Sequence, residues 1–160
     1  MSMVFNADEV LAMAAQIERN GGAFYRRAVE ISEGAGELLL QIAEQEDLHL
    51  ALFQGMREEL SATEAGETTF DPNNEAVLYL NAMADSHVFD LDEDNPKDLL
   101  KGDESLDDIF TMAIQAEKDS IAFFVGLREL VPESLGRGKV DDLIREETRH
   151  IRWLVERKLS

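Results

Sequence analysis

The chain has 160 residues, of which 44% are hydrophobic, so it can bury one substantial core and is expected to form a single domain over residues 1–160. Its 34 acidic residues outnumber the 15 basic ones and leave a net charge of -19, which argues against nucleic acid or an anionic membrane as a partner. The lack of Cys excludes disulfides and thiolate metal sites. No signal peptide and no run near the ~20 apolar residues of a membrane span is predicted, so a cytoplasmic protein is expected.

The first part of the chain predicts two helices. Helix-forming residues dominate throughout, and no segment alternates apolar and polar residues long enough to predict a sheet, so the fold is expected to be all-α. One helix is predicted from an N-cap at Asn6 to about Ile31, ahead of Gly34 and Gly36. The next is predicted over about residues 37–60, and the short connection between them favours antiparallel packing.

A long crossover is predicted next, over residues 61–104, with a short helix at about residues 74–84. Such a connection can return the chain along a helical bundle instead of turning straight back. The short helix carries an apolar stripe of Val77, Leu80 and Ala84. This stripe has to cover either its own bundle or a neighbouring subunit, and the residues alone leave both readings open.

The last third of the chain predicts two more long helices. One begins with a Ser-x-x-Asp cap at Ser105 and stops at Pro132. The other covers about residues 139–158, after Gly136 and Gly138. Four long helices with one long crossover predict a four-helix bundle.

The two halves of the sequence repeat one pattern of polar residues. In each half a lone Glu on one helix is followed by a Glu-x-x-His motif on the next helix. The copies of the lone Glu lie 99 residues apart, and the copies of the motif lie 101 residues apart. The residues concerned are Glu18, Glu46, His49, Glu117, Glu147 and His150.

Each of these residues interrupts an apolar helical stripe, and residues three apart lie on the same face of a helix. Because Glu is abundant in this chain, two Glu-x-x-His pairs alone are a weak signal; their placement in matching helices carries the weight. Four carboxylates that face one core need positive charge. Two divalent ions neutralise them, and two imidazoles complete the coordination, so the pattern predicts a buried two-metal site.

Two further polar residues are less informative. Tyr25 lies two turns beyond Glu18, where its hydroxyl can reach a ligand of a bound metal. A core aromatic residue with some other hydroxyl partner explains it equally well, and its counterpart in the second half, Phe124, has no hydroxyl. His87 has no Glu three residues before it and is predicted to be an ordinary, partly exposed histidine.

Together these motifs resemble the rubrerythrin branch of the ferritin-like superfamily, over all four long helices. The resemblance is carried by residues 17–25, 46–49, 117–120 and 146–150. It implies a ferritin-like bundle that holds two iron ions. It also implies ligand roles: Glu46 and Glu147 bridge the ions, Glu18 and Glu117 bind one ion each, and His49 and His150 each cap one ion.

Two departures from rubrerythrins matter. The chain has no Cys, so it lacks the iron site of their rubredoxin domain, and electrons must come from an external donor protein. Ser120 stands where rubrerythrins carry an extra carboxylate. This argues against a redox-driven exchange of iron ligands and leaves a more symmetric site of four Glu and two His.

The resemblance implies an oxidoreductase in which ferrous ions reduce hydrogen peroxide or dioxygen, as in a response to oxidative stress, within a homodimer. An iron-oxidising or storage protein of bacterioferritin type has the same ligand set and is the alternative. However, only ten residues follow His150, too few for the short fifth helix of cage-forming ferritins, so storage in a hollow shell is not expected. A small hydroxylase and a metal-free interaction bundle are further alternatives. Manganese or zinc can occupy the same oxygen and nitrogen ligands.

Overall fold

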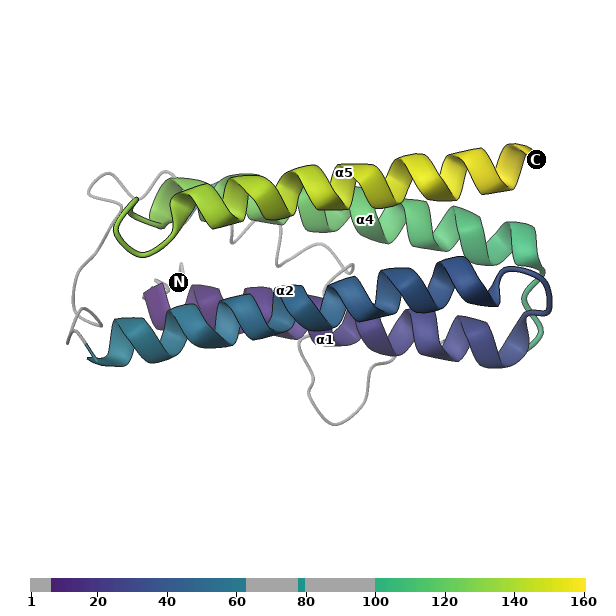
Figure 1. Ribbon diagram of the computed structural model, residues 1–160, viewed down its shortest axis with the longest axis horizontal. Helices are drawn as coiled ribbons and strands as arrows, with labels where there is room; N and C mark the ends of the chain where they lie inside the picture. The colour runs from purple at the N-terminus through teal and green to yellow at the C-terminus, as the bar shows by residue number, and fades with distance from the viewer. Residues whose placement is uncertain (1–6, 63–77, 80–99) are drawn as a thin grey trace.

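Four long helices make up the computed structural model, which describes residues 7–62, 78–79 and 100–160 (Figure 1). They are α1 Ala7–Ile31, α2 Gly36–Ala62, α4 Leu106–Leu130 and α5 Arg137–Leu159. These described ranges contain no β-strand, which confirms the prediction of an all-α four-helix bundle. None of the helices described is both long and apolar enough to cross a membrane.

The helices pack as two antiparallel pairs. α1 and α2 form one layer, and α4 and α5 form the other (Figure 1). α4 begins at the end of the bundle where α1 ends, and there Arg27 Nε donates a hydrogen bond of 3.4 Å to the Leu100 carbonyl. α2 and α4 therefore run in the same direction, as expected for a chain that returns along the bundle between them.

The ends of the second pair follow from local sequence signals. The Ser105 hydroxyl accepts a hydrogen bond of 3.1 Å from the Asp108 N–H, and the Asp108 carboxylate accepts one of 3.4 Å in return, so the predicted cap is present. Gly136 precedes α5 with a φ of 124°, a left-handed conformation that favours glycine. Gly138, predicted to precede the last helix, lies inside its first turn, because Gly136 alone makes the turn. The predicted cap at Asn6 lies outside the described residues.

Two apolar clusters fill the bundle. One includes the fully buried side chains of Leu11, Phe53, Phe123, Phe124 and Leu143. The other includes Ala28, Leu39, Ile42, Ile109 and Leu154. Along each helix the predicted Glu and His residues fall between these two sets, so a polar layer separates the apolar clusters. Five positions on the helical stripes around the Glu residues, Gly21, Val29, Leu50, Ile121 and Ile151, are only half-buried, at the edges of their stripes.

Only two residues of the predicted crossover helix are described. Leu78 and Tyr79 are helical, and the Tyr79 hydroxyl donates a hydrogen bond to the carbonyl of Ala122 on α4 of the same chain. Leu78 is 59% exposed. The predicted apolar stripe at Val77, Leu80 and Ala84 lies outside the described residues, and so does His87. Whether the crossover takes part in a homodimer therefore stays a prediction.

Candidate metal centre

The six predicted ligands lie together in the polar layer. α1 contributes Glu18, α2 contributes Glu46 and His49, α4 contributes Glu117, and α5 contributes Glu147 and His150. None of them is more than 5% exposed. Carboxylates are almost never this deeply buried without a partner of opposite charge, so the layer requires cations or protons.

The potential ligand atoms form two overlapping groups, and within each group they lie within 4.8 Å of one another. We call the group of Glu18, Glu46, His49 and Glu147 the Glu18 position. The group of Glu46, Glu117, Glu147 and His150 is the Glu117 position. Glu46 and Glu147 belong to both groups. The layer can thus hold two cations side by side, with two shared carboxylates and with one further carboxylate and one imidazole for each.

Both imidazoles present Nδ1 to the carboxylates. His49 Nδ1 lies 2.8 Å from Glu147 Oε1 and 3.5 Å from Glu18 Oε2. His150 Nδ1 lies 3.4 Å from one oxygen of each of three carboxylates, those of Glu46, Glu117 and Glu147. The two rings stack with their centroids 5.9 Å apart. The nitrogen available to a cation is therefore Nδ1 in both halves.

The other ring nitrogen of each histidine contacts a residue that the sequence analysis did not assign to the site. His49 Nε2 lies 2.6 Å from Glu146 Oε2, and His150 Nε2 lies 2.7 Å from Gln45 Oε1. If Nδ1 binds a cation, Nε2 carries the proton and donates it to these oxygens. A sequence signal existed: Gln45 and Glu146 each precede a shared Glu, and they lie 101 residues apart, like the motifs themselves.

Tyr25 contacts the site from α1. Its buried hydroxyl donates a hydrogen bond of 2.6 Å to Glu117 Oε1. The partner is thus the lone Glu of the opposite half, not Glu18 of its own helix. Burial, together with the charges of Glu117 and Glu46, raises the pKa of Tyr25 well above its usual range, so the hydroxyl keeps its proton and acts as a donor.

Burial and mutual repulsion favour the protonated form of three of the carboxyl groups. Burial and the charge of Glu147 raise the pKa of Glu18 well above its usual range. Burial with the charges of Glu18 and Glu147 does the same to the pKa of Glu46. The pKa of Glu117 is raised by burial and by Glu147 and Glu46. Without a cation the layer therefore binds protons.

Glu147 differs because both imidazoles contact it. Burial alone raises the pKa of Glu147, but contacts with Glu117 and with the two imidazoles hold this pKa well below its usual range. Burial alone lowers the pKa of His150, but contacts with Glu117 and Glu147 raise it to about 12. The pKa of His49 is also raised, by Glu147 against the effect of burial. The protonated His150 imidazole is thus a positive charge of the metal-free layer, and the same contacts favour protonation of His49.

Several atoms of this layer have no hydrogen-bond partner in the described part of the chain, although buried polar atoms nearly always have one. They are both carboxylate oxygens of Glu18 and of Glu147, Oε1 of Glu46, and Nδ1 of His49 and of His150. All belong to the predicted ligands and face one another. Hard oxygen donors with neutral imidazole nitrogens suit iron, manganese or zinc, so the residues present fit a pair of such ions.

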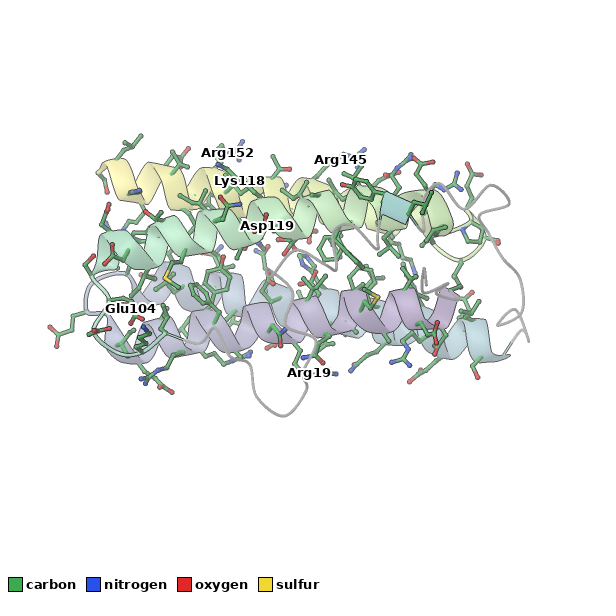
Figure 2. The ribbon with its side chains drawn as sticks, turned by 180° about the vertical axis from the view of Figure 1, so that it is seen from behind. Arg19, Glu104, Lys118, Asp119, Arg145 and Arg152 are labelled. Carbon is green, nitrogen blue, oxygen red and sulfur yellow. The ribbon has the colours of Figure 1, made fainter. Side chains whose placement is uncertain are left out.

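The backbone of α1 makes room for one shared carboxylate. A Cβ atom at Gly21 would lie 2.3 Å from Glu46 Oε2, so the carboxylate occupies the space that a side chain would fill. Charged neighbours in the sequence point the other way. Arg19 on α1 and Arg152 on α5 lie on the outer surface of the bundle (Figure 2). The helices thus direct the six predicted ligands inward and these two basic side chains outward.

No family model matches the sequence, and no curated protein matches it. Among solved structures, the chain is similar to a Thermotoga maritima protein proposed to be a ferritin-like diiron-carboxylate protein. The TM-score is 0.70 at 24% sequence identity, and the match covers 98% of this chain and 96% of that one. At this identity the likeness establishes the fold alone. The chain therefore has the ferritin-like four-helix fold.

Proposed function

We propose that the chain is a di-metal carboxylate protein whose native ions are iron. The observation that carries the proposal is the pair of overlapping ligand groups, which share Glu46 and Glu147 and contain the unpartnered buried atoms. Glu18 and Glu117 would each bind one ion, and the two shared carboxylates would contact both. Two divalent ions balance the four carboxylates and replace the protons that the layer otherwise holds.

The activity that we propose is reduction of hydrogen peroxide or dioxygen, of the rubrerythrin type. The support is the resemblance of the sequence motifs, together with the fold shared with a protein proposed to be a diiron-carboxylate protein. Two ferrous ions held by these residues would supply the electrons, one each, for the two-electron, two-proton reduction of hydrogen peroxide to two water molecules. An external donor protein would return the electrons, since these 160 residues contain no Cys that could hold a thiolate-bound electron-transfer iron. The proposed location is the cytoplasm.

The protein residues around the layer support such chemistry by position. The Tyr25 hydroxyl holds a proton against Glu117 Oε1. Phe53 lies one helical turn beyond His49, and its ring centroid is 5.4 Å from that of Phe124. Both rings are fully buried, and apolar rings beside the layer would suit a small oxidant better than a large substrate.

Metal analysis followed by rapid mixing tests this proposal. Purified protein should contain about two iron ions per chain. The ferrous form, mixed separately with hydrogen peroxide and with dioxygen, should oxidise rapidly with at least one of them, and a reducing protein should restore it through repeated cycles. Protein that holds no metal after incubation with ferrous iron would refute the metal site. Oxidation without turnover would refute the oxidoreductase activity alone.

Iron handling of bacterioferritin type is the second candidate, because the same ligand groups fit iron oxidation for storage. Continued addition of ferrous iron and oxygen distinguishes the two. Growth of a ferric mineral beyond the two bound ions favours storage, whereas catalytic consumption of peroxide favours the oxidoreductase.

We also propose a homodimer, with the crossover at or near the interface. Exposed Leu78 is the described residue consistent with it. Light scattering of the unaltered protein should give a dimer, and changing Val77 and Leu80 together to Asp should give monomers that still bind metal. A monomeric unaltered protein would refute the interface.

A further inference from the structure

The two histidines have the same place in the repeated pattern but different partners. His49 Nε2 contacts a carboxylate, Glu146, whereas His150 Nε2 contacts a neutral amide, Gln45. The two contacts are almost equally short, at 2.6 and 2.7 Å. The difference between the halves is therefore one of charge and not of geometry.

A carboxylate that accepts the Nε2 proton makes an imidazole a stronger ligand. The negative charge draws the proton away from the ring and increases the electron density at Nδ1, the atom that faces the site. An amide oxygen accepts the same hydrogen bond without a full charge. The Glu146 side chain is 41% exposed, so solvent weakens the effect without removing it.

The hydrogen bonds of Glu18 and Glu117 also favour tighter binding of a cation beside Glu18. Tyr25 donates to Glu117 Oε1, the oxygen that also lies 3.4 Å from His150 Nδ1. This hydrogen bond uses electron density that the oxygen would otherwise share with a cation. Both oxygens of Glu18, by contrast, lack any hydrogen-bond partner among the described residues. Phe124, the counterpart of Tyr25 in the repeat, has no hydroxyl to offer.

We propose that the two metal positions are inequivalent: the Glu18 position binds a divalent ion more tightly and fills first. The cause is Glu146, a positioning residue that accepts the Nε2 proton of His49. This inference rests on the proposed function, since it requires that both positions bind metal. It assigns roles to Glu146 and Gln45 that the ligand pattern does not contain.

Nuclear magnetic resonance of nitrogen-15-labelled histidine side chains, during titration with zinc, tests this order. Zinc is diamagnetic and accepts the same ligands, so each imidazole reports its own occupancy. After one equivalent, the metal-bound form of His49 should exceed that of His150 about tenfold, at the low end of the usual effect of such partners. His150 should follow with the second equivalent.

A double exchange of partners is the decisive variant. Glu146→Gln combined with Gln45→Glu keeps the composition and net charge and moves the carboxylate from His49 to His150. Both residues are half-buried, so both exchanges are tolerable at their sites. The order of filling should reverse, or the preference should at least fall to near equality. A merely structural role of Glu146 would weaken binding at both positions without changing the order.

If the two ions bind cooperatively, the titration does not separate the two positions. Two variants that each keep a single position then give the two affinities. Glu117→Ala leaves the Glu18 position, and Glu18→Ala leaves the Glu117 position, with the same loss of one carboxylate. The first variant should bind one zinc ion about tenfold more tightly than the second.

Three results would overturn the inference: equal affinities of these two variants, filling of His150 first in the unaltered protein, or an unchanged order after the double exchange. These results would leave a working two-metal site. If neither imidazole responds to zinc and no zinc is retained, the metal site itself is refuted and this inference with it.

Discussion

The first helix pair and the second helix pair contribute the same ligand types at corresponding places, but the residues around those ligands differ. One turn after its lone Glu, α1 has Gly21, where the Glu46 carboxylate lies against the backbone. At the corresponding place α4 has Ser120, whose hydroxyl donates to the Ala116 carbonyl of its own helix. Two turns after the lone Glu, α1 has Tyr25 and α4 has Phe124.

The ligands and their neighbours are subject to different requirements. The repeated ligands agree with the proposed function, because two cations of one kind would need two equal sets of donors. The neighbours need not repeat, because each only has to fit the space and the hydrogen bonds at its own place. A duplicated bundle can therefore keep a symmetric ligand set and still make its two halves chemically different. The following changes test where the halves are equivalent and where they are not.

The largest effect is expected at the shared carboxylates, where the two halves should be equivalent. Glu46→Ala and Glu147→Ala should each abolish most binding of both metal ions, because each removes a ligand of both positions. Glu44→Ala, at an exposed site on the same helix as Glu46, is the control. Metal content per chain is the measurement. Equal metal content in the Glu46 and Glu44 variants would refute the ligand assignment.

The second-largest effect is expected in the pH dependence of the free energy of unfolding, which reflects the charge of the whole layer. The raised pKa values of Glu18, Glu46 and Glu117 mean that the metal-free fold binds more protons than the unfolded chain, so its free energy of unfolding should fall as pH rises from about 5 to about 8. The raised pKa of His150 acts in the same direction. The lowered pKa of Glu147 stabilises the fold, and this contribution is lost only at more acid pH.

Bound metal should reverse this trend, since it displaces those protons and binds more tightly as pH rises. Denaturant unfolding of chelated and metal-loaded protein at both pH values measures the two slopes. The stabilisation by metal should be larger at the higher pH. The same slope in both forms would show that no ion replaces protons in this layer.

A difference between the halves should appear at Gly21 and Ser120. Gly21→Ala would displace the Glu46 carboxylate and weaken metal binding at least about tenfold, although Ala favours a helix by up to about 1 kcal/mol over Gly. The metal-free variant should lose little stability, because the helix preference of Ala offsets part of the cost of displacing Glu46. Ser120→Ala should change the metal affinity little. Calorimetric titration measures both, and equal affinities of the two variants would contradict the role of Gly21.

The smallest effect is expected for Tyr25. Tyr25→Phe removes the hydrogen bond to buried Glu117 and should lower the free energy of unfolding by about 1–2 kcal/mol. Tyr79→Phe, which removes a hydroxyl contact at a more exposed residue, should cost less. Denaturant unfolding of both variants tests the comparison. A Tyr25 variant no less stable than the Tyr79 variant would show that the hydrogen bond does not stabilise the layer.

The sequence by itself determined the helices and the six residues that meet between them. Helical periodicity places Glu46 and His49 on one face, and the apolar stripe around them directs that face inward. Local caps such as Ser105 with Asp108 also act within one turn, so the start of α4 could be predicted. These features depend on interactions between residues close in sequence or on burial pattern, which a sequence displays directly.

Only the tertiary structure decided what touches those six residues. The partners of Tyr25, His49 and His150 come from other helices, 92, 97 and 105 residues away in the chain. Gln45 and Glu146 are polar and half-buried at helix positions that look solvent-exposed in a periodic pattern. Which imidazole faces a carboxylate and which faces an amide depends on how the two helix pairs pack across the bundle, and no spacing within one helix contains that information.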